Sequence, residues 1–96
     1  MRPITVTRTG VGATTTVLLD WQNSSFAVGV GVVVSGTVTF NIEHTYDGTN
    51  WFAPAADTGK TANHDKGYTT PVLGVRTNVT AGTGSVAMTV LQGASL

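Results

Sequence analysis

The sequence predicts an all-β chain, and three observations lead to that prediction. Apolar residues alternate with polar or small residues from one end to the other, and no window of eleven or more residues places them at helical spacing. Eighteen threonines and fourteen valines favour strands. Turn signals recur about every 8 to 12 residues. We therefore expect a single domain over residues 1–96, a small antiparallel β-sandwich of about seven or eight strands, jelly-roll-like or immunoglobulin-like.

The first part of the chain contains three expected strands. Ile4 to Arg8 alternates with threonine and ends at Gly10-Val11-Gly12. Thr14 to Leu19 is mostly β-branched and leads into a polar loop, Asp20 to Ser25. Phe26 to Val34 alternates large residues with alanine and glycine, so one face of this strand is expected to be bulky and the other nearly bare.

The middle of the chain contains the most regular alternation. Ser35-Gly36 predicts a hairpin turn into a fourth strand, Thr37 to Tyr46. Asp47 to Asn50 is a turn by composition, because Asp bonds its own backbone and Gly takes a positive φ. Trp51-Phe52 then begins a short fifth strand. The residues expected on one face of the fourth strand are Val38, Phe40, Ile42, His44 and Tyr46.

The last part of the chain is expected to hold two further strands after a long loop. Ala53 to Thr70 contains a proline, two glycines, two lysines and two aspartates, and is interpreted as one exposed loop. Val72 to Val79 predicts a sixth strand, and Thr80 to Gly84 a glycine-rich turn. Ser85 to Gln92 predicts the last strand, with Val, Met and Val on one face.

Composition excludes several classes of function. Charged residues make up 10% of the chain, and the net charge is zero, whereas a soluble domain has about 25%. Nucleic-acid binding is not expected, because the five basic residues are scattered. The absence of cysteine removes disulfides and thiolate metal sites and is compatible with folding in a reducing cytoplasm. We expect neither a signal peptide nor a membrane span.

No motif in the sequence predicts catalysis. The two histidines, His44 and His64, lie outside any nucleophile motif, and His44 is expected to be a packed or rim residue. His64 with Asp57 could be imagined as a metal pair, but a solvated loop is the favoured interpretation. Nothing places a second carboxylate opposite Glu43. We therefore expect no enzyme, catalytic residue, metal, cofactor or small-molecule substrate, and we interpret the Gly-x-Gly segments as hairpin turns.

Residues Thr45 to Phe52 form the most distinctive segment. The pattern of Tyr46, Asp47, Gly48 and Trp51 resembles the Tyr-x-Asp-Gly-x-x-Trp hairpins of β-sandwich carbohydrate-binding modules and of phage structural proteins. One interpretation is structural: aromatic residues on the two sides of the Asp47-Gly48 turn form a cross-strand pair. The alternative is a sugar-stacking platform made by Tyr46 and Trp51, which requires these rings to be exposed.

The whole chain also resembles a family. The segments that carry the resemblance are Ile4 to Gly12, Val32 to Phe40, His44 to Gly48, Thr70 through Val79 and Val86 to Gln92. In pattern and composition they are similar to the short Thr-, Val- and Gly-rich head proteins of tailed double-stranded DNA bacteriophages. The resemblance implies a capsid decoration, or cement, protein: a β-sandwich present in many copies on the virion surface, without the long extended arm of some such proteins.

The partners that follow from this resemblance are the major capsid protein and further copies of the chain, as a dimer or trimer. A surface with few charges is also expected of a subunit that associates. Two alternatives stay open: a glycan- or receptor-binding module on a head fibre or tail, and a tail or neck connector. The aromatic residues expected at the protein interface lie at loops or strand ends: Trp21, Phe26, Trp51, Phe52 and Tyr68.

Overall fold

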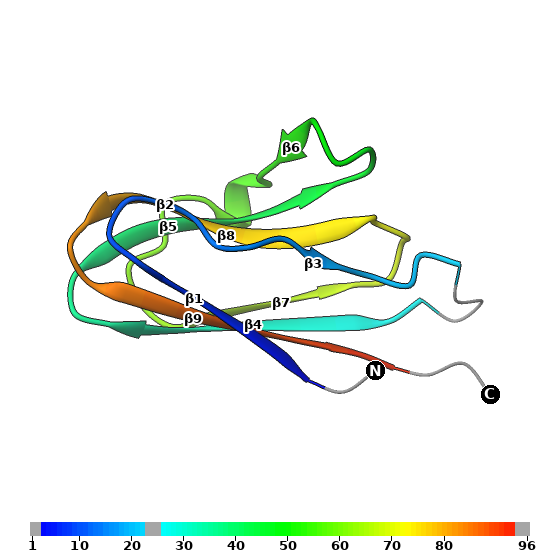
Figure 1. Cartoon of the computed structure of the whole chain (residues 1–96), viewed down its shortest axis with the longest axis horizontal. Coiled ribbons are helices and arrows are strands. Elements are labelled where there is room, and N and C mark those ends of the chain that lie inside the picture. The colour runs from blue at the N-terminus through cyan, green and yellow to red at the C-terminus, as the bar shows by residue number, and fades with distance from the viewer. Residues whose placement is uncertain (1–2, 23–25, 94–96) are drawn as a thin grey trace.

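The computed structural model describes residues 3–22 and 26–93, and it confirms a small β-sandwich of two antiparallel sheets packed face to face (Figure 1). Sheet A has the spatial order β1 (Ile4–Thr9), β9 (Ser85–Gln92), β4 (Val28–Ser35) and β7 (His64–Tyr68). Sheet B has the order β2 (Gly12–Ala13), β8 (Gly74–Gly82), β5 (Val38–Thr45) and β6 (Trp51–Phe52), with β3 (Val17–Leu18) also paired to β8. The one helical element among the described residues is the 3₁₀ turn η1 (Ala55–Asp57).

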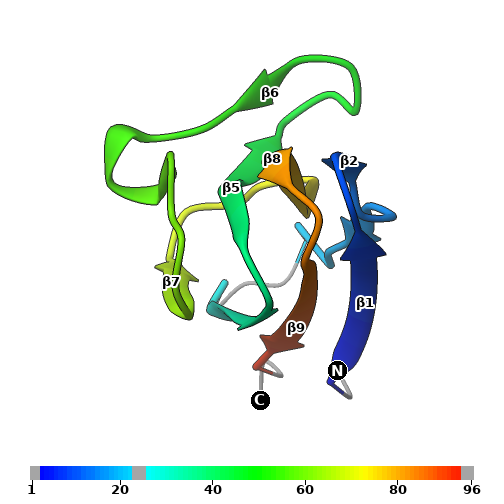
Figure 2. The ribbon, with the colours of Figure 1, turned by 90° about the vertical axis from the view of Figure 1, so that its left-hand side faces the viewer.

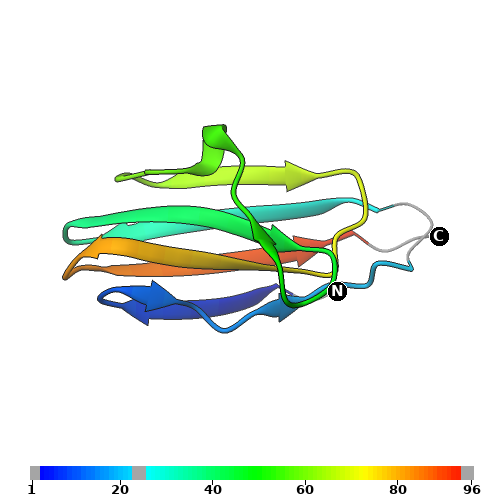
Figure 3. The same ribbon diagram turned by 90° about the horizontal axis from the view of Figure 1, so that it is seen from above.

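Three connections that the sequence predicts as hairpin turns are arches between the sheets. The Ser35-Gly36 turn joins β4 in sheet A to β5 in sheet B, and these strands pair with other neighbours. The connections β1 to β2 and β8 to β9 cross in the same way, so all three arches gather at one end of the molecule (Figures 1 and 2). Figure 3 shows the resulting stack, in which β2 lies over β1, β5 over β4 and β8 over β9.

Glycine is required where the arches touch one another. Gly84 N donates to Thr37 O, and Gly10 N donates to Gly84 O, both at 3.0 Å, so backbone hydrogen bonds join the three arches side by side. Gly82 has a φ of +101°, and a Cβ there would lie 2.3 Å from Thr37 O. The arches approach too closely for any side chain at this position.

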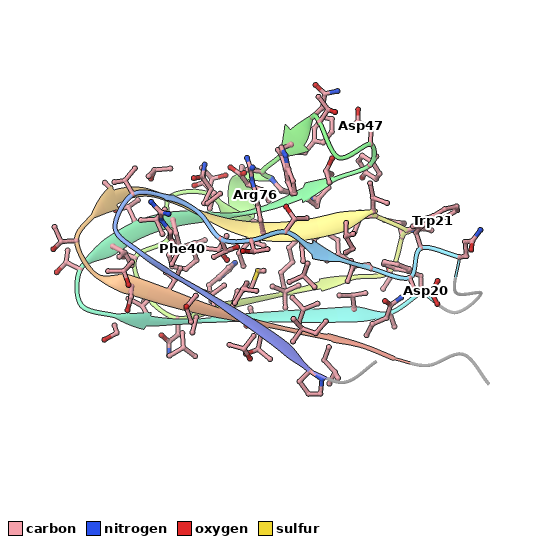
Figure 4. The ribbon with its side chains drawn as sticks, in the orientation of Figure 1. Asp20, Trp21, Phe40, Asp47 and Arg76 are labelled. Carbon is pink, nitrogen blue, oxygen red and sulfur yellow. The ribbon has the colours of Figure 1, made fainter. Side chains whose placement is uncertain are left out.

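The core lies between the two sheets and is built from the faces that the alternation predicts. Phe40 and Ile42 of β5 are fully buried, as are Val75 and Val79 of β8 (Figure 4 shows Phe40 between the layers). The facing layer is made by sheet A residues: Val28, Val30 and Val32 of β4 and Val86, Met88 and Val90 of β9. His44 is 8% exposed, which confirms the prediction of a packed histidine.

The prediction of one exposed loop from Ala53 to Thr70 is wrong. Its second half forms β7, which pairs with β4 along five residue pairs, and its first half contains η1 with a buried Asp57. The alternation was hidden because the side chains of β7 on the inner side are His64, Lys66 and Tyr68 rather than aliphatic residues. Polar side chains with long apolar stems can line the margin of a core without giving a hydrophobic pattern.

The expected strand from Thr14 to Leu19 is shorter and irregular. Two-residue strands, β2 and β3, both pair with β8 on either side of Thr14. Thr14 Oγ1 accepts the Thr77 amide at 3.1 Å, in place of a backbone carbonyl. A threonine side chain that competes with the ladder in this way interrupts the regular strand.

Candidate functional site

The outer face of sheet A, which we call the A face, carries the small side chains of four strands. Because the side chains of β4 and β9 alternate, the residues between the buried valines point away from the core. The register arranges them in rows from β7 toward β1: Gly67, Gly29 and Leu91; then Asp65, Gly31, Thr89 and Thr5; then Val33, Ala87 and Thr7. Three adjoining glycines, Gly29, Gly31 and Gly67, form what we call the glycine trough.

No contact within the chain requires glycine in the trough. A Cβ at Gly31 would meet no atom within 4 Å, and at Gly29 and Gly67 the nearest atoms would be carbonyl oxygens at 4.0 and 3.8 Å. None of the three has a positive φ. Glycine inside a strand lowers stability and often marks a place where a ligand or another backbone approaches closely. The trough therefore fits a surface that packs against another molecule.

The borders of the trough are apolar and exposed. Val33 is 59% exposed on β4, and Leu91 is 51% exposed on β9. Shallow hollows lie above the trough, one of them lined by Gly29, Gly67 and Leu91 and another by Gly31 and Val33. Asp65 is the one charged residue in the three rows. A bare, uncharged surface with aliphatic edges has the chemistry of the centre of a protein interface.

The opposite side of the sandwich carries the hairpin between β5 and β6, whose Asp47-Gly48 turn is confirmed. Asp47 Oδ1 accepts the amides of Thr49 and Asn50 at 2.8 Å each, and Oδ2 accepts Asn50 Nδ2 at 2.7 Å. These hydrogen bonds hold the pKa of the Asp47 carboxyl well below its usual value. Gly48 has a φ of +83°, as the turn requires. Figure 4 shows Asp47 at the tip of this hairpin.

An aromatic cluster, made by His44, Tyr46, Phe52 and Tyr68, holds the hairpin in place. The ring centroids of Tyr46 and Phe52 lie 5.7 Å apart across the two strands, so Phe52 rather than Trp51 makes the cross-strand pair with Tyr46. The His44 ring stacks on Phe52 at 6.0 Å and meets Tyr46 and Tyr68 edge-on at 5.4 and 5.3 Å. His44 Nδ1 and the Tyr68 hydroxyl are hydrogen-bonded at 3.2 Å.

Trp51 faces the outside of sheet B, where Arg76 covers it. The Arg76 guanidinium lies 4.0 Å from the centroid of the Trp51 ring, and Arg76 Nε donates to Glu43 Oε1 at 2.8 Å. The ion pair with Glu43 positions the guanidinium over the indole, so a cation–π contact already occupies one face of that ring.

The five aromatic residues predicted at an interface fall into three environments. Trp21 and Phe52 are about half exposed, at 51% and 49%. Trp51 is half-buried under Arg76. Phe26 and Tyr68 are buried in the core, because their strand-end positions lie under the opposite sheet rather than at the surface. Two of the five side chains are thus well presented to a partner.

The structure brings Trp21 and Tyr46 to one hollow at the end of the sandwich that is opposite the arches. Its other lining residues are Pro71, Val72 and Leu73, and the lining is predominantly apolar. Figure 4 shows Trp21 at this end, beside the loop that precedes β8. Tyr46 is 58% exposed. The sequence-based prediction of a stacking platform paired Tyr46 with Trp51, which lies elsewhere.

A polar cluster at the margin of the core contains the one buried carboxylate of η1. Asp57 Oδ2 pairs with Lys66 Nζ at 2.6 Å, and Asp57 Oδ1 with His64 Nε2 at 2.9 Å. Burial alone would raise the pKa of Asp57, but the hydrogen bonds from Lys66 and His64 outweigh burial and hold that pKa below its usual value. The sequence analysis considered Asp57 and His64 together but favoured a solvated loop, which is wrong, and it did not include Lys66. The alternation of His64, Lys66 and Tyr68 was a signal that a strand passes here.

Among residues 3–22 and 26–93, no group of three or more His, Cys, Asp or Glu side chains is placed to hold a metal ion. The same ranges contain no helix with the length and apolar character needed to cross a membrane. Comparison of the chain with protein-family models, with curated proteins and with solved structures finds no match in any of the three.

Proposed function

We propose that the chain is a non-enzymatic structural protein of a bacteriophage particle, a decoration protein that binds the major capsid protein in many copies and stabilises the shell. The glycine trough is the observation that carries this proposal. Glycines with no role inside the fold fit a surface shaped for close approach by another protein. The sequence resemblance to phage head proteins supplies the identity of that partner.

The proposed mechanism is passive. The A face packs on the shell, with backbone and side chains of the capsid protein entering the trough between Val33 and Leu91. Each contact is small and nearly uncharged, and the symmetry of the shell repeats it many times. Repetition converts a modest affinity per copy into a large total stabilisation against the pressure of packaged DNA.

Filling the trough tests this proposal. In the double variant Gly29→Val/Gly31→Val, the Cβ added at either position would meet no atom closer than 4.0 Å, and valine favours strands. We expect the variant to fold at least as stably as the wild type and to bind shells that lack the protein at least tenfold more weakly. Ala81→Val is the matched control, an exposed position of β8 on sheet B, and should bind normally.

The measurement is the number of bound copies per particle, counted by mass spectrometry after sedimentation of the shells, together with their location by imaging. Hundreds of copies on the head are expected. A handful of copies, or copies confined to the tail or neck, would overturn the decoration proposal and favour a connector. Normal binding by Gly29→Val/Gly31→Val would show that the A face is not the surface that contacts the shell.

The hollow lined by Trp21 and Tyr46 favours a second candidate function, glycan or receptor binding. Exposed aromatic rings stack on the apolar faces of sugars. In this proposal the stacking residue is Trp21 and not Trp51, because Arg76 covers one face of the Trp51 ring. Saturable quenching of tryptophan fluorescence by a sugar, lost in Trp21→Ala and kept in Trp51→Phe, supports it. A glycan array without a hit counts against it.

A further inference from the structure

Strand β1 forms one edge of sheet A, and this edge is unprotected. Its six residues pair with β9 on one side, and no strand among the described residues pairs with the other side. All six are exposed or half-exposed. An edge strand presents a row of free N–H and C=O groups, which another extended strand can satisfy.

The other edges of the sandwich carry features that prevent pairing. β7 presents Asp65 and Lys66, and Lys66 is tied to Asp57. The edge strands of sheet B, β2, β3 and β6, are two residues long. Short strands and charged residues are the usual protection against edge-to-edge association.

β1 is six residues long, and its one charged residue lies near its end. It runs through Ile4, Thr5, Val6 and Thr7 without a charge, a glycine or a bulge in its register with β9. Its one charged residue is Arg8, whose guanidinium folds back and donates to the Val11 carbonyl. The contrast between β1 and β7, the two edges of the same sheet, points to an edge that is kept open for a partner.

We infer that β1 is the surface through which two copies of the chain join, by antiparallel pairing of β1 with β1 of a second copy about a twofold axis. This inference rests on the proposed function, in which many copies of the chain lie on one shell. Residues opposite each other across such a pair lie on the same face of the sheet. Among the registers that meet this condition, two pair five of the six residues of β1, with the axis at Val6 or at Thr7, and both set threonine opposite threonine on the A face.

The sequence of β1 suits self-pairing. Threonine pairs directly opposite one another stabilise an antiparallel ladder, and like charges there destabilise it. Thr5 already bonds Thr89 of the neighbouring strand through their hydroxyl groups at 2.9 Å, so the threonines extend as a row across the edge. The product is a continuous eight-stranded sheet, and the glycine troughs of both copies lie on one side of it, where one shell surface can meet both.

The test uses the isolated full chain, so a failure of self-association is distinguishable from a failure to bind shells. Sedimentation velocity over a wide range of concentration is expected to show a monomer–dimer equilibrium. In Thr5→Lys/Thr7→Lys both registers set lysine opposite lysine, and the dimer should weaken by more than about tenfold, a change of about 1.4 kcal/mol. Thr61→Lys/Thr70→Lys, with the same added charge in exposed loops, should dimerise as the wild type does.

Cross-linking then places the contact. Because the chain has no cysteine, single substitutions Val6→Cys and Thr7→Cys can be oxidised without competing thiols. The residue on the axis lies opposite the same residue of the second copy, within the range of a disulfide bond. A covalent dimer from either variant supports the inference. A wild-type chain that stays monomeric, a dimer that survives Thr5→Lys/Thr7→Lys, or the absence of cross-linking in both cysteine variants would overturn it.

Discussion

At the scale of single residues, Asp57 is the charged group on which the margin of the core depends. It is 3% exposed and pairs with both His64 and Lys66, which come from β7. Asp57→Asn keeps the shape and removes the charge, which leaves two cationic or polar partners facing a neutral amide. We expect the free energy of unfolding in denaturant to fall by about 2 kcal/mol.

Asp65→Asn is the matched control for this prediction. Asp65 is on the same strand but exposed on the A face, and its change should stay within about 0.5 kcal/mol. Equal effects of the two substitutions would show that the Asp57 pairs contribute no more than a surface charge does.

His44 gives the fold a dependence on pH. Burial lowers the pKa of His44, Lys66 lowers it further, and the opposing effect of Asp57 is smaller. The unfolded chain therefore binds a proton more readily than the folded chain, so stability is complete above the unfolded pKa of about 6.5 and declines as the pH falls through it. Asp57, whose folded pKa is also lowered, contributes stability that is lost below about pH 4.

We therefore predict a loss of unfolding free energy in two stages as the pH falls from 7 to 3. Denaturant unfolding at a series of pH values measures it. His44→Gln should flatten the first stage, between about pH 7 and 5, and leave the second in place. An unchanged slope in that variant over the first stage would mean that His44 is not its source.

At the scale of elements, the glycines divide into those that the fold requires and those that it tolerates. Gly82→Ala combines a positive φ with a clash against Thr37 O and should lower the free energy of unfolding by at least about 2 kcal/mol. Gly10→Ala has the positive φ without the clash and should cost about 1 kcal/mol. Gly31→Ala has neither and should raise stability by a few tenths to about 1 kcal/mol.

Thermal or denaturant unfolding of these three variants gives the comparison. The expected order of stability is Gly31→Ala, wild type, Gly10→Ala and Gly82→Ala. A destabilised Gly31→Ala would mean that the trough glycines serve the fold itself, and it would remove the argument that they serve a partner.

The elements also show what the sequence could and could not predict. A period of two places residues such as Phe40, Val75 and Val90 in the core, because alternation reports which side of a strand is buried. It does not report whether the next strand lies in the same sheet. Ser35-Gly36 and Asp47-Gly48 have similar turn chemistry, yet the first crosses between the sheets and the second closes a hairpin.

The candidate surface was predictable in part. The bare face of β4 follows from the alternation of valine with Gly29 and Gly31, but the third trough glycine, Gly67, is placed beside them by a strand that the hydrophobic pattern did not reveal. The aromatic residues were predictable as a group and not one by one. Phe26 and Tyr68 lie under the opposite sheet, and only the tertiary packing decides that.

At the scale of the whole molecule, the charges are few, and four of the ten charged side chains pair with one another within the chain. Glu43 holds Arg76, and Asp57 holds Lys66 and His64. The net charge is zero, and the A face carries a single carboxylate in its three central rows. Long-range electrostatic attraction therefore contributes little to association with any partner.

The consequence is a prediction about salt. If the A face docks on the shell, raising sodium chloride from low to high concentration should change the affinity by less than about threefold, since screening acts on charges and not on buried apolar area. Ammonium sulfate at equal ionic strength should strengthen binding, because sulfate favours the burial of apolar surface. Titration of labelled protein onto shells in each salt measures both effects, with Asp65→Asn as the variant that removes the remaining charge from the face. A tenfold loss of affinity in sodium chloride would show that charged residues outside the A face make the contact.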